Sequence, residues 1–266
     1  MARRFTLVAF HAHPDDEALL MGGTLARLAA EGHRVVLAVA TDGEAGAAAS
    51  SYRSAGRLAA YRRDELDRSA AALGCARVVR FGFKDSGWPA AADGFSTLAV
   101  EDAAAPLIEL LREERADALT IYDPAGGYGH PDHRQVHTVG TYAAARAGTP
   151  LVLEATIDRR LIRRLIRIVT TIPGVLPAVS AADYDHAYSP GTAITHRVDV
   201  RAYAAQKRHS FEAHASQASS DDGARTLSLL LKLPRWLFRL MLGHEWYVEH
   251  GRTPGTPLDD VFASLR

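Results

Sequence analysis

The sequence has little that would place it outside a reducing cytoplasm. It has one cysteine, Cys75, so no disulfide can form within the chain. This cysteine follows Gly74 in an apolar stretch, where we expect a small core residue rather than a nucleophile. The apolar run 5–10 is too short for a signal peptide, and no segment approaches the roughly 18 apolar residues of a membrane span. We therefore expect a soluble, cytoplasmic protein.

An excess of charge of one sign is also missing. Lys plus Arg number 31 and Asp plus Glu number 31, so the formal net charge is zero. This balance gives no overall attraction to nucleic acid or anionic lipid, and neither is expected as a partner. Hydrophobic residues make up 47% of the chain, which is enough for a large core and unlike a disordered composition.

Apolar β-type runs and helical patterns alternate through the first 156 residues. Strands are expected at 5–10, 34–41, 77–83, 118–122 and 151–155, and helices at 18–31, 61–73, 103–115 and 133–147. Strict alternation implies right-handed βαβ units and hence a parallel sheet. We predict a Rossmann-like α/β fold: an open, mostly parallel sheet with helices on both faces. No Gly-x-Gly-x-x-Gly follows the first strand, which argues against a nicotinamide or flavin cofactor.

The regular alternation ends near residue 156. A basic amphipathic stretch occupies 159–169, a late strand is expected at 196–200 and a helix at 201–213. The apolar segment 227–242 is interrupted by Pro234. No linker, repeat or low-complexity tract divides the chain. We predict a single domain over 1–266, with a core at about 5–156 and a C-terminal elaboration at about 157–266.

Two turns rich in His and Asp follow the first and fourth expected strands. Residues 11–17 read His-Ala-His-Pro-Asp-Asp-Glu, and residues 130–133 read His-Pro-Asp-His after a glycine-rich turn. In the common strand order 3-2-1-4 these two strands are neighbours, and ligands bind at the carboxyl ends of strands where the winding reverses. We therefore expect the two turns to face each other.

The residue types in these turns indicate a catalytic zinc site. Zinc in catalytic sites takes three protein ligands and leaves a position for water. His13 and Asp16 are three residues apart, so both can reach one ion, and His133 is the natural third ligand. Asp15 points elsewhere, beside the ion, where it could accept a proton from water. His130 could polarise a carbonyl oxygen or protonate a leaving amine.

A simpler interpretation exists for each turn taken alone. A His at the end of a strand is more often a hydrogen-bonding or capping residue than a ligand. Asp15 and Glu17 could serve only as acidic residues that stabilise a helix N-terminus. The presence of two such turns at the same edge of the sheet favours the functional interpretation.

Further motifs extend the pattern over about residues 5–217. They are Gly-Gly-Thr at 22–24, Thr-Asp-Gly-Glu-Ala-Gly at 41–46, Arg-Arg-Asp-Glu-Leu at 62–66, Asp-Ser-Gly at 85–87, and Ala-His-Ala-Ser-Gln at 213–217. In this order the motifs resemble the LmbE-like, or PIG-L, family of zinc-dependent N-acetylglucosaminyl de-N-acetylases. That family includes deacetylases and amidases of mycothiol and bacillithiol biosynthesis and deacetylases of antibiotic amino sugars.

The resemblance implies roles for eight residues. Zinc would be held by His13, Asp16 and His133, with Asp15 as general base; Fe²⁺ or another divalent ion would fit the same donors. His130 would be the general acid or oxyanion stabiliser, and Asp132 would orient its imidazole. Arg62 and Asp85 would bind substrate hydroxyls, although the neighbouring Arg63 leaves the arginine register open by one position.

Several histidines receive no catalytic role. His137 lies four residues after His133, but no Glu follows His133 to complete a His-Glu-x-x-His motif. We expect it to be a supporting or core residue. His214 and Gln217 match the late family motif, but no role can be derived for them. The remaining histidines, expected to be structural or exposed, are His11, His33, His186, His196, His209, His244 and His250.

The predicted activity is hydrolytic removal of an N-acetyl group from an amino sugar or N-acetylglucosaminyl conjugate, which gives acetate and a free amine. Its partner is a small acetylated sugar. One alternative is an amidase of thiol conjugates of the mycothiol type; another is a non-catalytic sugar-binding protein. The 227–242 segment is expected to pack on the core, with lipid contact as the second interpretation. The sequence does not decide whether the chain forms a homo-oligomer.

Overall fold

The computed structural model describes residues 3–46, 57–169, 185–218 and 226–266. Within these residues a seven-stranded sheet has the order β3-β2-β1-β4-β5-β7-β6. Five strands are parallel: β1 (Thr6–His11), β2 (Arg34–Thr41), β3 (Arg77–Phe83), β4 (Ala118–Tyr122) and β5 (Leu151–Thr156). The predicted mostly parallel α/β sheet and the strand order 3-2-1-4 are confirmed.

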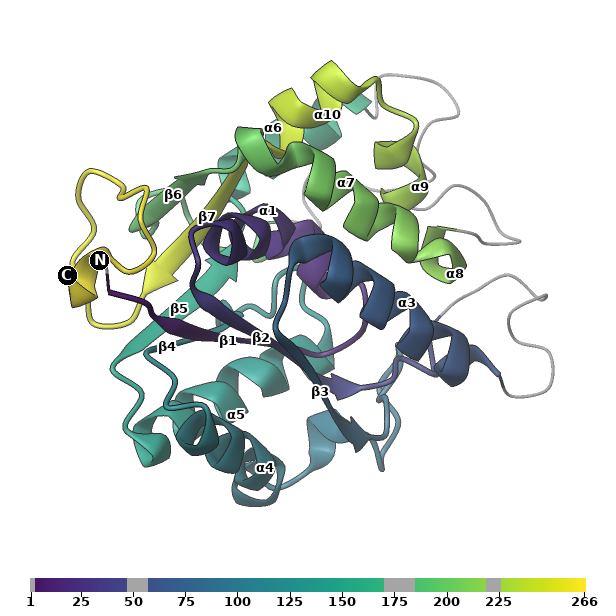
Figure 1. Ribbon diagram of the computed structural model, residues 1–266. Coiled ribbons are helices and arrows are strands. Elements are labelled where there is room, and N and C mark those ends of the chain that lie inside the picture. Colours follow the sequence, from purple (N-terminus) through teal and green to yellow (C-terminus); the bar gives the residue numbers. More distant parts are fainter. Residues whose placement is uncertain (1–2, 47–56, 170–184, 219–225) are drawn as a thin grey trace.

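Helices cover both faces of this sheet (Figure 1). One face carries α1 (Asp16–Ala30), α3 (Leu58–Leu73) and α7 (Ala204–Ala213), which pack against one another. The other face carries α4 (Val100–Glu113) and α5 (Pro131–Ala147). The four helices expected in the core start two to three residues earlier than their apolar patterns suggested. The helix expected at 201–213 begins as a short 3₁₀ segment at Arg201–Tyr203 and continues as α7.

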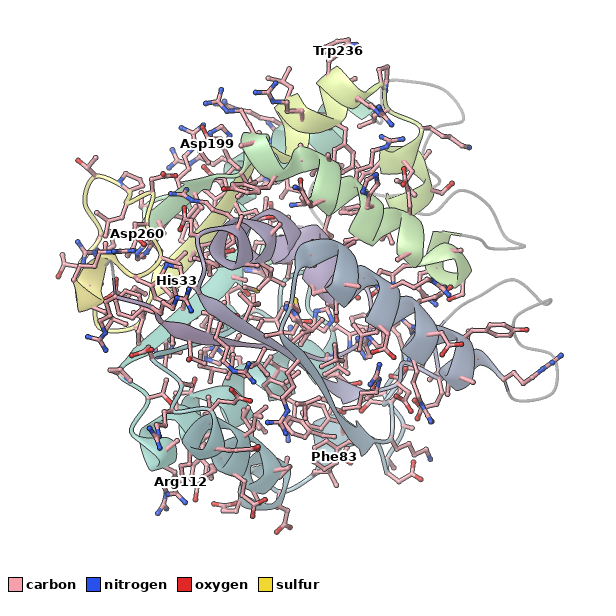
Figure 2. The ribbon with its side chains drawn as sticks, in the orientation of Figure 1. His33, Phe83, Arg112, Asp199, Trp236 and Asp260 are labelled. Atoms are coloured by element: carbon pink, nitrogen blue, oxygen red, sulfur yellow. The ribbon has the colours of Figure 1, made fainter. Side chains whose placement is uncertain are left out.

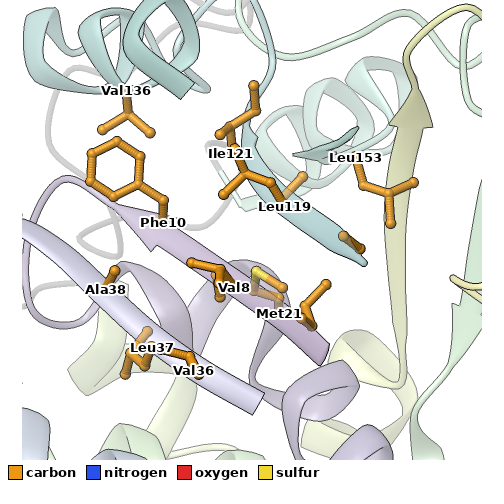
Figure 3. Close-up of a cluster of buried hydrophobic side chains, with 14 of the residues drawn as sticks. Val8, Phe10, Met21, Val36, Leu37, Ala38, Leu119, Ile121, Val136 and Leu153 are labelled. Carbon is orange, nitrogen blue, oxygen red and sulfur yellow. The ribbon is translucent and has the colours of Figure 1, made fainter. Parts of the chain in front are cut away.

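The central strands are buried on both faces, which explains their unbroken apolar sequences. Leu7 to Phe10 in β1 and Val35 to Ala40 in β2 are fully buried. Strands covered by helices on both sides carry continuous hydrophobic runs instead of an alternating pattern. Figure 3 shows Val8 and Phe10 of β1 among side chains from β2, β4 and the flanking helices, including Val136 of α5.

The C-terminal part adds two strands and several short helices. The strand β6 (His196–Asp199) agrees with the expected one, but β7 (His244–Glu249) was not predicted. The strand β7 runs antiparallel to both β5 and β6, so it joins the elaboration to the core sheet. Its sequence, His-Glu-Trp-Tyr-Val-Glu, alternates buried and half-buried side chains and follows directly on an apolar helix, which hides its boundary.

A buried carboxylate on this strand connects it to α7 and to the first helix. Lys207 of α7 and Glu245 of β7 are both almost fully buried, with Nζ and Oε1 2.6 Å apart. The Glu245 carboxylate also accepts the backbone N–H groups of Gly23 and Thr24 in α1. Gly23 lies so close to Val200 that a Cβ would come within 2.5 Å of its side chain. The Gly-Gly-Thr motif therefore marks the contact between α1 and the C-terminal elaboration.

The apolar segment 227–242 forms two short helices, α9 (Thr226–Leu231) and α10 (Arg235–Leu242), with Pro234 as the N-cap of the second. Phe238 is buried against Ala18 and Phe211, as core packing predicts. Trp236, at the outer side of α10 in Figure 2, is 68% exposed. The basic stretch forms α6 (Arg159–Val169). Among the described helices, none combines the length and apolar character needed to cross a membrane.

Candidate active site

The two His/Asp turns meet at one edge of the sheet. Strands β1 and β4 are neighbours, and each leads into a turn at its carboxyl end. His13 lies in the first turn, and His130 is the N-cap of α5 in the second. Their ring centroids are 4.8 Å apart, so the prediction that the turns face each other is confirmed.

Asp16 connects the two turns electrostatically. Its carboxylate oxygens lie 3.4 Å from Nδ1 of His13 and 3.4 Å from Nε2 of His133. Burial alone would raise the pKa of Asp16, but the two imidazoles outweigh it and hold that pKa well below its usual range. The three residues predicted to bind zinc therefore lie together, with Asp16 between the histidines.

The surroundings of these residues fit a divalent cation. One nitrogen each of His13, His130 and His133 lies within 4.8 Å of the others. Neither ring nitrogen of His133 makes a hydrogen bond within the described part of the chain, although both are buried. Burial would lower the pKa of His13, but Asp132, Asp16 and Asp85 raise it well above the ordinary value. Nitrogen and carboxylate donors in surroundings that favour positive charge are what zinc requires.

Asp132 contacts His130 through its backbone and His13 through its carboxylate. Its carboxylate accepts hydrogen bonds from Nε2 of His13 and from the backbone N–H of Ser86, both at 3.1 Å. His130 is instead held by the backbone of Asp132, whose N–H donates to Nδ1 at 3.2 Å. The reason is geometric: Asp132 lies two residues after the N-cap of α5, where its N–H points back at the capping side chain.

Asp85 also faces the first turn. Its Oδ1 lies 3.4 Å from Nε2 of His13, while its carboxylate accepts the backbone N–H groups of Ala45 and Gly87. Asp85 is buried, and hydrogen bonding and charge from His13 hold its pKa below the ordinary value against the opposing effect of burial. Its role in binding a substrate hydroxyl stays a prediction.

Asp15 occupies a strained backbone position at the start of α1. Its φ of 109° lies in the left-handed region, which non-glycine residues rarely adopt. Burial raises the pKa of its carboxyl to about 6, against the opposing charge of Arg62. Such strain is maintained only where surrounding contacts fix it, and it is common at functional sites.

Arg62 supplies one of those contacts. This buried guanidinium lies 3.4 Å from Oδ2 of Asp15 and donates to the carbonyl oxygens of Pro14 and Gly43. A Cβ at position 43 would come within 2.0 Å of the guanidinium, which explains the glycine there. The described contacts of Arg62 therefore fix the first turn; its predicted contact with substrate is not tested by them.

Glu17 and His214 form a buried network beneath Asp15. Glu17 accepts the backbone N–H of Asp15 at 3.0 Å, Nε2 of His214 lies 2.6 Å from its carboxylate, and Ser69 donates to the same group. Glu17 was expected only as support for the helix terminus. The late motif that contains His214 signalled its importance, but only the fold shows that it lies against the first turn.

Tyr122 was not singled out from the sequence. Its ring stacks on that of His133, with centroids 4.1 Å apart and planes 2° apart. Its hydroxyl accepts the backbone N–H of Ala12. The last residue of β4 therefore positions one turn through its ring and the other through its hydroxyl group.

Two aromatic side chains lie beside His130 at the surface. Trp88 is 64% exposed and Tyr128 is 51% exposed, and their ring centroids are 6.4 Å apart. The centroid of Trp88 is 5.4 Å from that of His130. Exposed aromatic faces of this kind can pack against the apolar face of a sugar ring.

The other histidines lie apart from this centre or behind it. His137 is one turn after His133, and its Nδ1 lies 3.1 Å from the carbonyl oxygen of Tyr122. His11 is buried, and burial lowers its pKa. The described contacts of His33, His196, His244 and His250 are away from the two turns, and His186 and His209 are exposed.

Comparison with protein families gives a match to the PIG-L model, described as GlcNAc-PI de-N-acetylase, over residues 8–144. Similar relatives include the 1D-myo-inositol 2-acetamido-2-deoxy-alpha-D-glucopyranoside deacetylase of Streptomyces griseus. That protein is 35% identical over 295 residues, which cover 99% of this chain and 89% of the relative.

Solved structures share the fold. The N,N'-diacetylchitobiose deacetylase of Pyrococcus horikoshii matches with a TM-score of 0.62 and 23% identity, covering 92% of this chain and 83% of its own. The 4-carboxy-2-hydroxymuconate hydratase GalB of Pseudomonas putida matches with a TM-score of 0.60 and 16% identity, covering 96% and 99%. Because a hydratase and a deacetylase both have this architecture, the fold alone does not specify the reaction.

Proposed function

We propose, on the premise that the chain belongs to the PIG-L family of GlcNAc-PI de-N-acetylases, that it is a metal-dependent hydrolase which removes the N-acetyl group of an N-acetylglucosaminyl conjugate. The observation that carries this proposal is the convergence of His13, Asp16 and His133 beside Asp15 and His130. The family supplies the reaction type, and the site supplies each group that amide hydrolysis needs.

The donors for the metal would be His13, Asp16 and His133, with zinc as the expected ion. A bound divalent ion would act as a Lewis acid toward the acetyl carbonyl and would make a water molecule more acidic. Asp132 and Tyr122 would position the ligands, since the first is hydrogen-bonded to His13 and the second stacks on His133. Partners of this kind fix the orientation of ligand rings.

Asp15 would act as the general base. A base works best when its pKa is close to the pH at which the enzyme operates, and burial raises the pKa of Asp15 to about 6. Glu17 and Arg62 would hold the Asp15 backbone and carboxylate in the left-handed turn, so that the carboxylate stays directed beside the ion. Asp15 would take the proton of the attacking water and return it to the leaving nitrogen as the C–N bond breaks.

His130 would stabilise the oxyanion as a neutral hydrogen-bond donor. The backbone N–H of Asp132 donates to its Nδ1, so this nitrogen carries the lone pair and Nε2 carries the proton. Burial and the neighbouring histidines lower the pKa of His130 to about 4, which keeps the ring neutral near pH 7. Of the two roles expected for His130, the geometry supports the stabilisation of the oxyanion over the donation of a proton.

The relatives' substrate suggests an N-acetyl-α-glucosaminyl inositol as the first compound to test. Trp88 and Tyr128 would hold the acetylated sugar at the surface beside His130. Arg62 and Asp85 would contact it nearer the first turn. The experiment is to load the purified chain with zinc and to measure acetate release from N-acetylglucosaminyl inositol, free N-acetylglucosamine and a mycothiol-type thiol conjugate.

Acetate release from the inositol conjugate, lost after chelation and restored by zinc, is the expected result. Cleavage of the thiol conjugate without acetate release would replace the proposal by the amidase. A chain that binds the sugar but no metal would replace it by the non-catalytic binding protein.

A further inference from the structure

A second group of potential metal ligands lies outside the active site. One ligand atom each of His137, Glu154 and His250 lies within 4.8 Å of the other two. The residues come from α5, from β5 and from the turn that follows β7. No part of the deacetylase proposal uses them, and none belongs to the two His/Asp turns.

The backbone brings these three residues together independently of their side chains. In the antiparallel pairing of β5 with β7, Glu154 lies opposite Val248. Two residues further, the backbone N–H of His250 donates to the carbonyl of Val152 at 3.0 Å. His250 is therefore fixed beside β5, on which Glu154 lies. The strand β5 pairs on its other side with β4, and α5 packs against both strands.

The hydrogen bonding of His137 leaves a nitrogen lone pair for a ligand. Its Nδ1 lies 3.1 Å from the carbonyl oxygen of Tyr122. A carbonyl oxygen can only accept, so this contact keeps the proton on Nδ1, and a neutral His137 has its lone pair on Nε2. Histidines that bind metals usually donate their other ring N–H to a backbone carbonyl or carboxylate in this way.

The carboxylate of Glu154 supplies negative charge at a buried position. Its Oε1 is hydrogen-bonded to Nε2 of His250 and lies 3.6 Å from Nδ1 of His137, the protonated nitrogen of that ring, so Nε2 of His137 remains for the ion. Glu154 is buried, whereas His250 is exposed and His137 half-buried, so the group opens to solvent on one side. An entering cation would replace the proton that His250 shares with Glu154, and water could complete its coordination.

We propose that His137, Glu154 and His250 form a second divalent-metal site, with zinc as the preferred ion, that ties α5 and β5 to the turn after β7. Two imidazoles and one carboxylate are a common zinc donor set. Zn–N and Zn–O bonds of about 2.0–2.2 Å place tetrahedral ligands about 3.4 Å apart. The three ligand atoms already lie within 4.8 Å of one another, so side-chain shifts of about 1 Å would bring them to this separation.

The test is zinc stoichiometry of the whole chain, measured by elemental analysis after chelation and equilibrium dialysis against zinc. The wild-type chain is expected to hold about two zinc ions, and His250→Ala and Glu154→Gln about one each. His209→Ala, at an exposed position on α7, is the matched control and keeps about two. His133→Ala removes the ion of the active site, and the double variant His133→Ala/His250→Ala removes both.

A second measurement separates binding from folding. In the His133→Ala background, zinc is expected to raise the thermal unfolding temperature, and this rise is lost when His250→Ala is added. About one zinc per wild-type chain, lost in His133→Ala and unchanged in His250→Ala, would overturn the second site and leave the proposed deacetylase intact. Two zinc ions per wild-type chain, one of them lost in His250→Ala, without acetate release would support the second site and overturn the proposed deacetylase.

Discussion

Two groups of potential metal ligands meet at α5, one through His133 and the other through His137, one helical turn later, and they differ in their surroundings. The catalytic group, His13, His130 and His133, is buried and surrounded by Asp15, Asp16, Asp85 and Asp132. The peripheral group, His137, Glu154 and His250, has one carboxylate that is already paired and one exposed imidazole. The first group therefore has several carboxylates around its histidines, and Asp15 lies beside it in a strained backbone conformation. These features suit a reaction centre. The second suits structural support.

Replacing the two histidines of α5 separately would test this difference most strongly. His133→Ala is expected to lower kcat/KM by about 1000-fold or more, because a ligand of the reacting ion is lost. His137→Ala, four residues away on the same helix, is expected to change kcat/KM by about threefold or less. The measurement is acetate release at saturating zinc. Equal losses in the two variants would contradict the assignment of the reaction to one group.

Within the catalytic group, Asp15 is expected to serve the reaction without holding the metal. Asp15→Asn should lower kcat by about 100-fold to 10,000-fold while zinc content stays at the wild-type value. Asp42→Asn, at the end of β2 where Asp42 pairs with Arg63, is the control and should retain activity. Loss of zinc in Asp15→Asn would show that Asp15 is a ligand.

The network beneath Asp15 should have a smaller effect. Glu17→Gln removes the charge that faces His214 and weakens the hold on the Asp15 backbone, so kcat should fall by about tenfold with KM and zinc content unchanged. Ser69→Ala removes a single hydroxyl from the same carboxylate and should affect kcat less. A fall in KM or zinc content instead of kcat would indicate a different role for Glu17.

Tyr122 contacts both groups, since its ring stacks on His133 and its carbonyl accepts from His137. Tyr122→Phe keeps both contacts and loses only the hydroxyl, which accepts the Ala12 N–H and is hydrogen-bonded to the Asp16 carboxylate. The free energy of unfolding should fall by about 1 kcal/mol, with zinc content unchanged and activity close to wild type. Denaturant unfolding checks the first value. A large loss of activity would show that the hydroxyl has a part in the reaction.

The sequence was sufficient to predict that the two His/Asp turns lie together, because each turn follows a strand that can be recognised from its local apolar pattern. The runs ending at His11 and Tyr122 indicate buried parallel strands, and topology then brings the two turns together. The contacts of Glu17 with His214, and of Asp132 with His13, join residues 197 and 119 positions apart, and no local pattern specifies such pairs. The strand β7 was missed because its alternation is short and only one residue, Gly243, separates it from the apolar helix α10.

The contact between α1 and Glu245 has a consequence for the order in which the protein is made. The helix that begins at the catalytic turn is held by a carboxylate 222 positions further along the chain. A domain synthesised from its N-terminus cannot form this contact until β7 has left the ribosome. Until then Lys207 and the N–H groups of Gly23 and Thr24 lack this carboxylate as a partner. The contact that holds α1 to the C-terminal elaboration therefore forms only after residue 245 has been synthesised.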